Sequence, residues 1–429
     1  MSGVAGSADG APPPGEAART WRRTWVGAVV VGVFGATPFF AYFGNLGFAL
    51  LVGLAGFACL PTLLRRRRPD LGVAILLVLV IWAMASMLWS VAAPPHPDFS
   101  RHKAGELTAL KLPLELALYG AFAIAALSLP PSTARRATLV LGIGLAAMAA
   151  VFMVDAVLQA PLYRAIRTLA HQAPRTDRGL RDLSRASYVL ALLFWPAAVR
   201  FDSPRLRFVA AALAAATLVG AFVLNADAPV AAFGVATAVF FAVSLLGRPA
   251  LIALLVGTVL YFAAAPVLIA LFDSGQMLHP APDDVRIQSW AIRLDIWRFA
   301  AARIHEHPYL GWGIDAARTF SPYIPLHTHN GAIQLWLELG AVGAGLAALF
   351  WSWILVQIDR LEAIDRRLAA AIAAAVSAYL TIGALSFGIW QEWWLALGAL
   401  TAAVCIALAK ARAAEVEIGP DLDGGATAP

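Results

Sequence analysis

The sequence has 429 residues, of which 60% are hydrophobic and 14% charged, and its formal net charge is +6. Soluble domains are about half apolar and about a quarter charged, so this composition excludes an ordinary soluble protein and indicates a chain that crosses a membrane many times. The positive charge does not indicate nucleic-acid binding, because most of the basic residues flank apolar segments, as the positive-inside bias requires.

Repeated apolar segments predict an all-α, polytopic integral membrane protein with about twelve transmembrane helices. We place them at roughly 25–42, 46–64, 71–92, 108–128, 137–158, 186–200, 208–226, 229–246, 249–272, 331–353, 368–389 and 393–411. They form a single transmembrane domain over residues 23–412. Residues 1–22 and 413–429 are rich in small and polar residues and are predicted to be disordered tails.

The loops that follow the even-numbered segments are basic, from Arg65–Arg68 after the second to Arg366 and Arg367 after the tenth. This bias places these loops and both termini in the cytoplasm. The two long loops, 159–185 and 273–330, and all eight histidines then lie on the outer side. Long loops among short ones usually carry function, so we expect the functional site there.

The first long loop is rich in arginine and poor in acidic residues. The guanidinium group of arginine can donate two parallel hydrogen bonds to phosphate oxygens, so this loop predicts an anion-binding site. Arg181 and Arg185 are one helical turn apart and lead into the sixth segment, so they are best placed to bind the anion. The alternative is a solvated loop on the anionic membrane surface. The other arginines are Arg164, Arg167, Arg175 and Arg178.

The second long loop contains a helical pattern from Val285 to about Glu306 with one apolar stripe. Arg286 and Arg293 are seven residues apart and therefore project from the same side of this helix. If the helix lies on the membrane, both can reach an anion at headgroup level. The alternative is that they reach out to solvent or pair with acidic residues.

Four histidines follow within 25 residues: His305, His307, His327 and His329. A metal site is one interpretation, but the spacing matches no zinc pattern and no cysteine is near, so we predict no metal. Acid–base chemistry is favoured, because a neutral imidazole can take a proton from a sugar hydroxyl. Asn330 can cap the tenth segment, whose N-terminus also favours an anion.

Several charged residues lie near the outer ends of the segments, at the depth of these arginines. Lys111, near the outer end of the fourth segment, is the candidate to bind substrate. Gly340, Gly343 and Gly345 are predicted only to allow close helix packing. The other charged residues are Glu115, Asp155 and Asp227.

One motif carries a resemblance. His329, Asn330, Gly340 and Gly343 have the identities and spacing of a signature of the O-antigen ligase and polymerase superfamily, which this chain resembles. The stretches 293–297 and 307–313 are also similar to the family's arginine-tryptophan and histidine-proline-glycine segment. One departure is that Asn225-Ala226-Asp227-Ala228 stands where the family often has a Ser-Arg pair. The resemblance would then give that role to Arg185.

The resemblance implies a GT-C-like glycosyltransferase in the bacterial inner membrane with its active site facing the periplasm. It implies an O-antigen ligase that transfers polysaccharide from undecaprenyl pyrophosphate to lipid A-core, by a metal-independent, inverting displacement without a cofactor. His329 and Arg293 would be catalytic. The further partners implied are membrane lipids, an O-antigen polymerase and a chain-length regulator. The substrate-binding residues would be Arg185, Arg181, Arg286, Lys111 and Asn330.

Two alternatives stay open. An O-antigen polymerase would use the same donor with a second lipid-linked glycan as acceptor. A lipid or polysaccharide flippase or transporter would show inverted repeats, broken helices and charges at the bilayer midplane. The charges here gather at the outer face, which favours a transferase.

Overall fold

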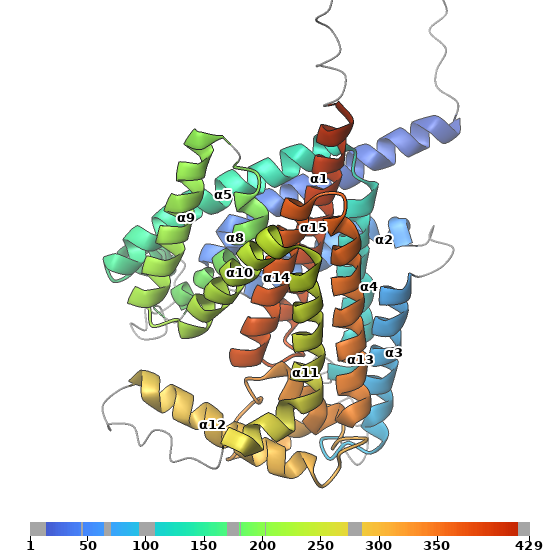
Figure 1. The fold of residues 1–429 in the computed structure, drawn as a ribbon, viewed down its shortest axis with the longest axis vertical. Coiled ribbons are helices and arrows are strands. Elements are labelled where there is room, and N and C mark those ends of the chain that lie inside the picture. The colour runs from blue at the N-terminus through green and yellow to red at the C-terminus, as the bar shows by residue number, and fades with distance from the viewer. Residues whose placement is uncertain are drawn as a thin grey trace, which may run out of the picture.

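The structure is a computed structural model that describes residues 14–43, 46–63, 70–93, 108–169, 180, 182–201, 203–272 and 285–418. Within these ranges, the side chains of 14–22, 46, 204–205, 272, 285–288 and 414–418 are not described. In the described residues every regular element is a helix (Figure 1). The predicted all-α fold is therefore confirmed.

The first half of the chain contains α1 (Pro14–Tyr42), α2 (Leu46–Leu63), α3 (Leu71–Ala85), η1 (Ser86–Leu88), α4 (Thr108–Ala125), η3 (Ala126–Ser128), α5 (Pro131–Val157), α6 (Pro161–Leu169) and α8 (Ala186–Ala198). The second half contains α9 (Pro204–Val223), α10 (Asp227–Leu246), α11 (Arg248–Phe272), α12 (Val285–Ile304), η4 (Ala316–Thr319), α13 (Gly331–Glu362), α14 (Arg366–Leu385) and α15 (Glu392–Ile418).

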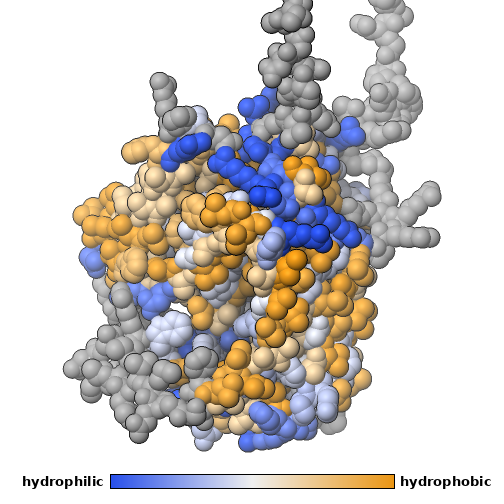
Figure 2. All heavy atoms as spheres, viewed as in Figure 1, coloured by the Kyte–Doolittle hydropathy of each residue, from blue (hydrophilic) through white to orange (hydrophobic). Residues whose placement is uncertain are grey.

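The chain is a multi-pass membrane protein. Ten helices in the described residues are long and apolar enough to cross a membrane. Each of the twelve predicted segments coincides with a helix, but α8 has only 13 residues and the apolar part of α2, Gly47–Leu63, is also short. Figure 2 shows the consequence, a hydrophobic band between two hydrophilic ends.

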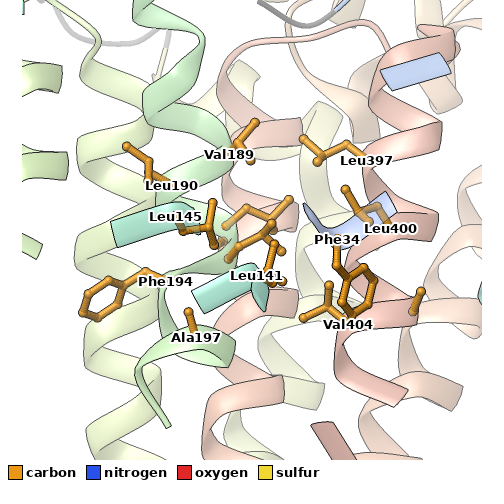
Figure 3. Packing of buried hydrophobic residues seen from close by; sticks show 14 of the residues in the cluster. Phe34, Leu141, Leu145, Val189, Leu190, Phe194, Ala197, Leu397, Leu400 and Val404 are labelled. Atoms are coloured by element: carbon orange, nitrogen blue, oxygen red, sulfur yellow. The ribbon is translucent and has the colours of Figure 1, made fainter. Parts of the chain in front are cut away.

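The short helix α8 lies in the centre of the bundle. Its consecutive residues 189–194 face all sides of the helix, and each is at most 5% exposed. Figure 3 shows α8 residues packed against Leu141 and Leu145 of α5, with α15 beyond them. A helix buried on all sides must be apolar all round, which is why its sequence resembled a full membrane span.

The two ends of the bundle differ. The first residues of α1 and the last residues of α15 lie at one end, and α12 lies across the opposite end (Figure 1). Both terminal helices are longer than predicted, since α1 begins at Pro14 and α15 runs to Ile418. Proline suits the first turn of a helix and the residues after it include good helix formers, so the helix extends into the predicted tail.

The start of the first long loop is anchored by Asp155. Its carboxylate accepts hydrogen bonds from the N–H groups of Leu162 and Tyr163, at 2.7 and 3.1 Å, and from the Tyr42 hydroxyl at 2.7 Å. These contacts fix the N-terminus of α6 against α1. Asp155, a candidate for function from its position in a span, therefore has a structural role here.

The helices that carry the remaining candidate residues converge at the end where α12 lies. α12 packs against α11 and α13, and α14 packs against α8, α10 and α13. The residues just before α13 thus lie close to the start of α8 and the end of α14.

Candidate active site

The helix that follows the His329-Asn330 pair is broken at Gly340. This residue of α13 has φ 64° and ψ −164°, a conformation that is accessible almost only to glycine. A Cβ atom at this position would overlap the backbone of Tyr309 and Leu310. Gly340 was predicted to allow close packing within a span. The close approach is present, but it is to the backbone of a loop, and the residue also interrupts the helix.

The loop segment 308–313 fits into this break. The N–H groups of Trp312 and Gly313 donate to the carbonyl oxygens of Leu337 and Glu338, each at 2.8 Å. A broken helix leaves carbonyl groups without partners, and buried carbonyl groups need them. The loop supplies those partners and so holds residues 331–339 as a short, buried half-helix.

Asn330 caps that half-helix, as predicted. Its Oδ1 accepts the N–H of Ile333 and the hydroxyl of Tyr261, both at 3.1 Å. The side chain is buried, and its oxygen already has two donors. Asn330 thus fixes the direction in which the preceding residue enters the helix, and that residue is His329.

The imidazole of His329 is held in one tautomer. Its backbone has φ 56°, and its Nδ1 lies 2.7 Å from the carbonyl oxygen of Ser386, at the end of α14. A carbonyl can only accept, so Nδ1 carries the proton and, in the neutral ring, Nε2 keeps a free lone pair. The His329 N–H donates to Nδ1 of His327 at 3.2 Å, which gives His327 the opposite tautomer.

Both imidazoles are neutral near pH 7. Burial lowers the pKa of His329 below its ordinary value of 6.5, and the charge of Arg293 lowers it further, against the Ser386 carbonyl, which raises it. Burial, followed by the charges of His329, Arg318 and Arg293, lowers the pKa of His327 to about 3. In the described part of the chain no three His, Cys, Asp or Glu side chains gather in a possible metal site.

Arg293 of α12 lies beside these imidazoles. Its guanidinium stands 4.8 Å from the ring centre of Trp290, and the indole N–H of Trp290 donates to Asp227 at 3.2 Å. Burial lowers the pKa of Arg293, and the charge of Asp227 partly opposes this. Among the described residues no carboxylate pairs directly with the guanidinium, so its donors can still bind an anion.

Tyr188 of α8 completes the cluster from the other side. Its hydroxyl lies 3.2 Å from the Ser386 hydroxyl. Arg185 and Arg293 are both close enough to interact electrostatically with this hydroxyl. Arg185 also pairs with Asp182, at 3.1 Å. Arg185 and Arg293, which come from the two long loops, therefore both lie near Tyr188, and Tyr188 contacts Ser386, the residue that bonds to His329.

Part of the chain is similar to known proteins. Residues 210–348 match a family model described as O-antigen ligase. Residues 210–348 form an O-antigen ligase family domain. Proteins named as polysaccharide ligases are 35% identical over 124 residues in Rickettsia conorii and 33% identical over 124 residues in Rickettsia prowazekii. Each alignment covers 26% of this chain and 30% of the relative, so the chain matches less than a third of the length of these curated relatives.

The O-antigen ligase domain contains only part of the cluster. Asp227, Arg293 and His329 lie within residues 210–348, whereas Tyr188 and Ser386 lie outside that range. The fold around the domain therefore completes the site, because α8 and the end of α14 supply the remaining groups.

The structure places the other predicted binding residues differently. Arg181 lies outside the described residues, and Arg286 lies in α12 with its side chain not described. Lys111 of α4 is paired with Glu392 at the start of α15, with 2.6 Å between Nζ and Oε1. Its positive charge is thus already matched by a carboxylate.

Sequence reasoning missed Tyr188, Ser386 and Trp290. A signal was present for two of them, since Tyr188 follows Arg185 by three residues and Trp290 precedes Arg293 by three, which in a helix is one turn. For Ser386 there was none, because its contribution to His329 is a backbone carbonyl that any residue possesses.

Proposed function

We propose that this protein is an O-antigen ligase that transfers polysaccharide from undecaprenyl pyrophosphate to a sugar hydroxyl of lipid A-core. One observation carries the proposal: His329 keeps its proton on Nδ1, bonded to Ser386, so that Nε2 is unprotonated in a neutral ring near Arg293. A base next to an anion-binding cation is what transfer from a pyrophosphate-linked donor requires. The likeness to proteins named as polysaccharide ligases also supports it.

The base is His329. Nε2 takes the proton of the acceptor hydroxyl while that oxygen attacks the anomeric carbon of the donor sugar. The bond between this carbon and the pyrophosphate oxygen breaks, and the leaving group departs with the electron pair. Because burial and Arg293 keep the imidazole neutral, the base is ready at pH 7 without prior loss of a proton.

The leaving pyrophosphate is held by arginines. Arg293 and Arg185 approach from α12 and from the start of α8, and both act on Tyr188 between them. Their charges would stabilise the negative charge that develops on the leaving oxygen, the role that a divalent cation has elsewhere. We assign Arg181 and Arg286 to the same pyrophosphate. A single displacement of this kind inverts the anomeric carbon and needs no metal.

The loops and the fold support a placement in the membrane. The site lies at the end of the bundle opposite the start of α1 and the end of α15 (Figure 1). With basic loops in the cytoplasm of the inner membrane, the site faces the periplasm, at the depth where a lipid-linked pyrophosphate would lie.

The test is reconstitution of the purified protein with undecaprenyl-pyrophosphate-linked O-antigen and lipid A-core, with and without a metal chelator. We expect lipopolysaccharide from the wild type in both conditions and none from His329→Ala. His305→Ala is the matched control, because the Nδ1 of His305 also lies 2.7 Å from a backbone carbonyl, that of Ala301. Longer lipid-linked glycan without lipopolysaccharide would instead identify a polymerase.

A further inference from the structure

The loop that joins α14 to α15, residues 386–391, carries the carbonyl that fixes the His329 tautomer. Two contacts tie this loop to the half-helix that follows His329. The N–H of Ile389 donates to Oε1 of Gln334 at 3.0 Å. The indole N–H of Trp390 donates to Oε2 of Glu338. The loop is therefore attached to the same short helix whose first turn positions His329.

Glu338 is linked to both contacts, directly to Trp390 and through Gln334 to Ile389. It is fully buried, and its Oε1 accepts hydrogen bonds from Nε2 of Gln334 at 3.2 Å and from the N–H of Ala317 at 3.4 Å. With Trp390 the carboxylate has three N–H donors from three segments. In the described part of the chain none of its partners is a cation.

A buried carboxylate held only by neutral donors is costly, and a glutamine or an apolar residue would be cheaper if packing were all that mattered. The two oxygens of Glu338 together accept from three N–H donors that approach from different directions. A glutamine would turn an N–H₂ group toward one of the three donors. The carboxylate thus suits a junction that must orient several segments together.

The position of Glu338 in the chain also supports its role as a junction between segments. Glu338 lies two residues before the break at Gly340, and its backbone carbonyl oxygen accepts the N–H of Gly313. Glu338 therefore connects the helix break with the loops 308–313 and 386–391. The second of these loops contains Ser386, whose carbonyl oxygen is bonded to the imidazole of His329.

We propose that Glu338 is a positioning residue for His329: by holding the loop 386–391 through Trp390 and Gln334, it keeps the Ser386 carbonyl against Nδ1 and leaves Nε2 directed to the substrate. That His329 acts as a base rests on the proposed function. The placement of the imidazole by Glu338 does not depend on it.

The groups that face His329 set its titration. They are the Ser386 carbonyl at the end of α14, Arg293 from α12, and His327 on the same segment. Glu338 is not among them, so a change at Glu338 reaches the imidazole through its position and its contact with water. If the loop loosens, water reaches the ring and the main cause of its lowered pKa is reduced.

The experiment measures the imidazole without needing turnover. Diethyl pyrocarbonate acylates a neutral imidazole nitrogen, and mass spectrometry of peptides reports His329 separately from the other seven histidines. The rate of acylation is followed against pH in the full-length protein in lipid vesicles, for the wild type, Glu338→Gln and Trp390→Phe. Glu362→Gln is the control, because Glu362 lies at the far end of α13 and pairs with Arg366 at 2.7 Å.

We expect the midpoint for His329 to lie below 6.5 in the wild type and in Glu362→Gln, and to move up toward 6.5 in Glu338→Gln. Trp390→Phe, which removes one donor and keeps an aromatic ring, should move it in the same direction by less. In the transfer assay kcat should fall roughly 10- to 100-fold in Glu338→Gln with little change in the KM for the donor.

An unchanged midpoint in both Glu338→Gln and Trp390→Phe would overturn the positioning role, even if Glu338→Gln unfolds more easily. A shifted midpoint together with no transfer by the wild type would overturn the proposed function and leave the positioning role supported. The two ideas therefore fail in different measurements.

Discussion

The Nδ1 atom of His329 lies 2.7 Å from the carbonyl oxygen of Ser386, 57 residues later in the chain. This contact decides which ring nitrogen carries the proton, and it joins the N-terminal end of α13 to the C-terminal end of α14. The chemistry that we propose depends on it, since only a ring with its proton on Nδ1 offers Nε2 as a base.

The first prediction concerns the pH dependence of transfer. The folded-state pKa of His329 lies below 6.5, so the neutral base persists as the pH falls to 6.5 and is lost only below it. The value of kcat/KM should therefore stay level down to pH 6.5 and decline at lower pH, as measured with saturating acceptor. A decline that begins above pH 6.5 would argue against His329 as the base.

A second prediction follows for stability. Between pH 6.5 and about 3, His327 is protonated in the unfolded chain but not in the folded protein, so the unfolded state binds more protons. The thermal unfolding midpoint should fall as the pH falls through this window. His327→Asn keeps an acceptor for the His329 N–H and removes the titrating ring, so its midpoint should depend less on pH. An equal pH dependence in both proteins would contradict the assignment.

The third prediction concerns Arg293. Arg293→Ala should lower kcat by roughly 100- to 1000-fold, because it removes a charge from the developing leaving group. Arg293→Lys should recover only part of this, since an ammonium lacks the planar fork. Arg298→Ala is the control on the same helix, because Arg298 pairs with Asp295 at 3.4 Å. An equal decrease in kcat for Arg293→Ala and Arg298→Ala would contradict a specific role of Arg293 in transfer.

The support beneath Arg293 can be tested separately. Trp290→Phe keeps an aromatic face under the guanidinium and removes the hydrogen bond to Asp227, whereas Trp290→Leu removes both. A cation–π contact of about 0.5–1 kcal/mol corresponds to roughly a two- to fivefold weaker binding of donor in Trp290→Leu than in Trp290→Phe. Donor binding to lipid-reconstituted protein, measured at equilibrium, distinguishes them. Identical affinities would show that the ring does not support Arg293.

The fifth prediction concerns the helix break. Gly340→Ala should lower the free energy of unfolding by about 1–3 kcal/mol or more, because alanine at this φ is strained and its Cβ meets the backbone of Tyr309. Gly345→Ala, on the same helix with open space at the Cβ position, should be neutral or slightly stabilising. Thermal unfolding in detergent compares the two, and equal midpoints would mean that the break is not required.

The sequence by itself determined the helical architecture and indicated the candidate base. Runs of apolar residues mark helices, so each of the twelve predicted segments coincides with a helix, ten of which in the described residues are long enough to cross a membrane. His329 with Asn330 stood out as polar residues at the start of one of them. The cap by Asn330 was also predictable, because it is formed within one helical turn.

Only the tertiary structure decided what surrounds His329. Gly340 breaks its helix because the loop 308–313 supplies the hydrogen bonds that the break leaves open, and no local pattern reports a partner so far along the chain. Ser386 contributes a carbonyl, and Glu338 a contact to a distant loop, neither of which has a sequence signature. Periodicity records which face of a helix is apolar, whereas tautomer, charge and orientation at this site come from groups brought together by packing.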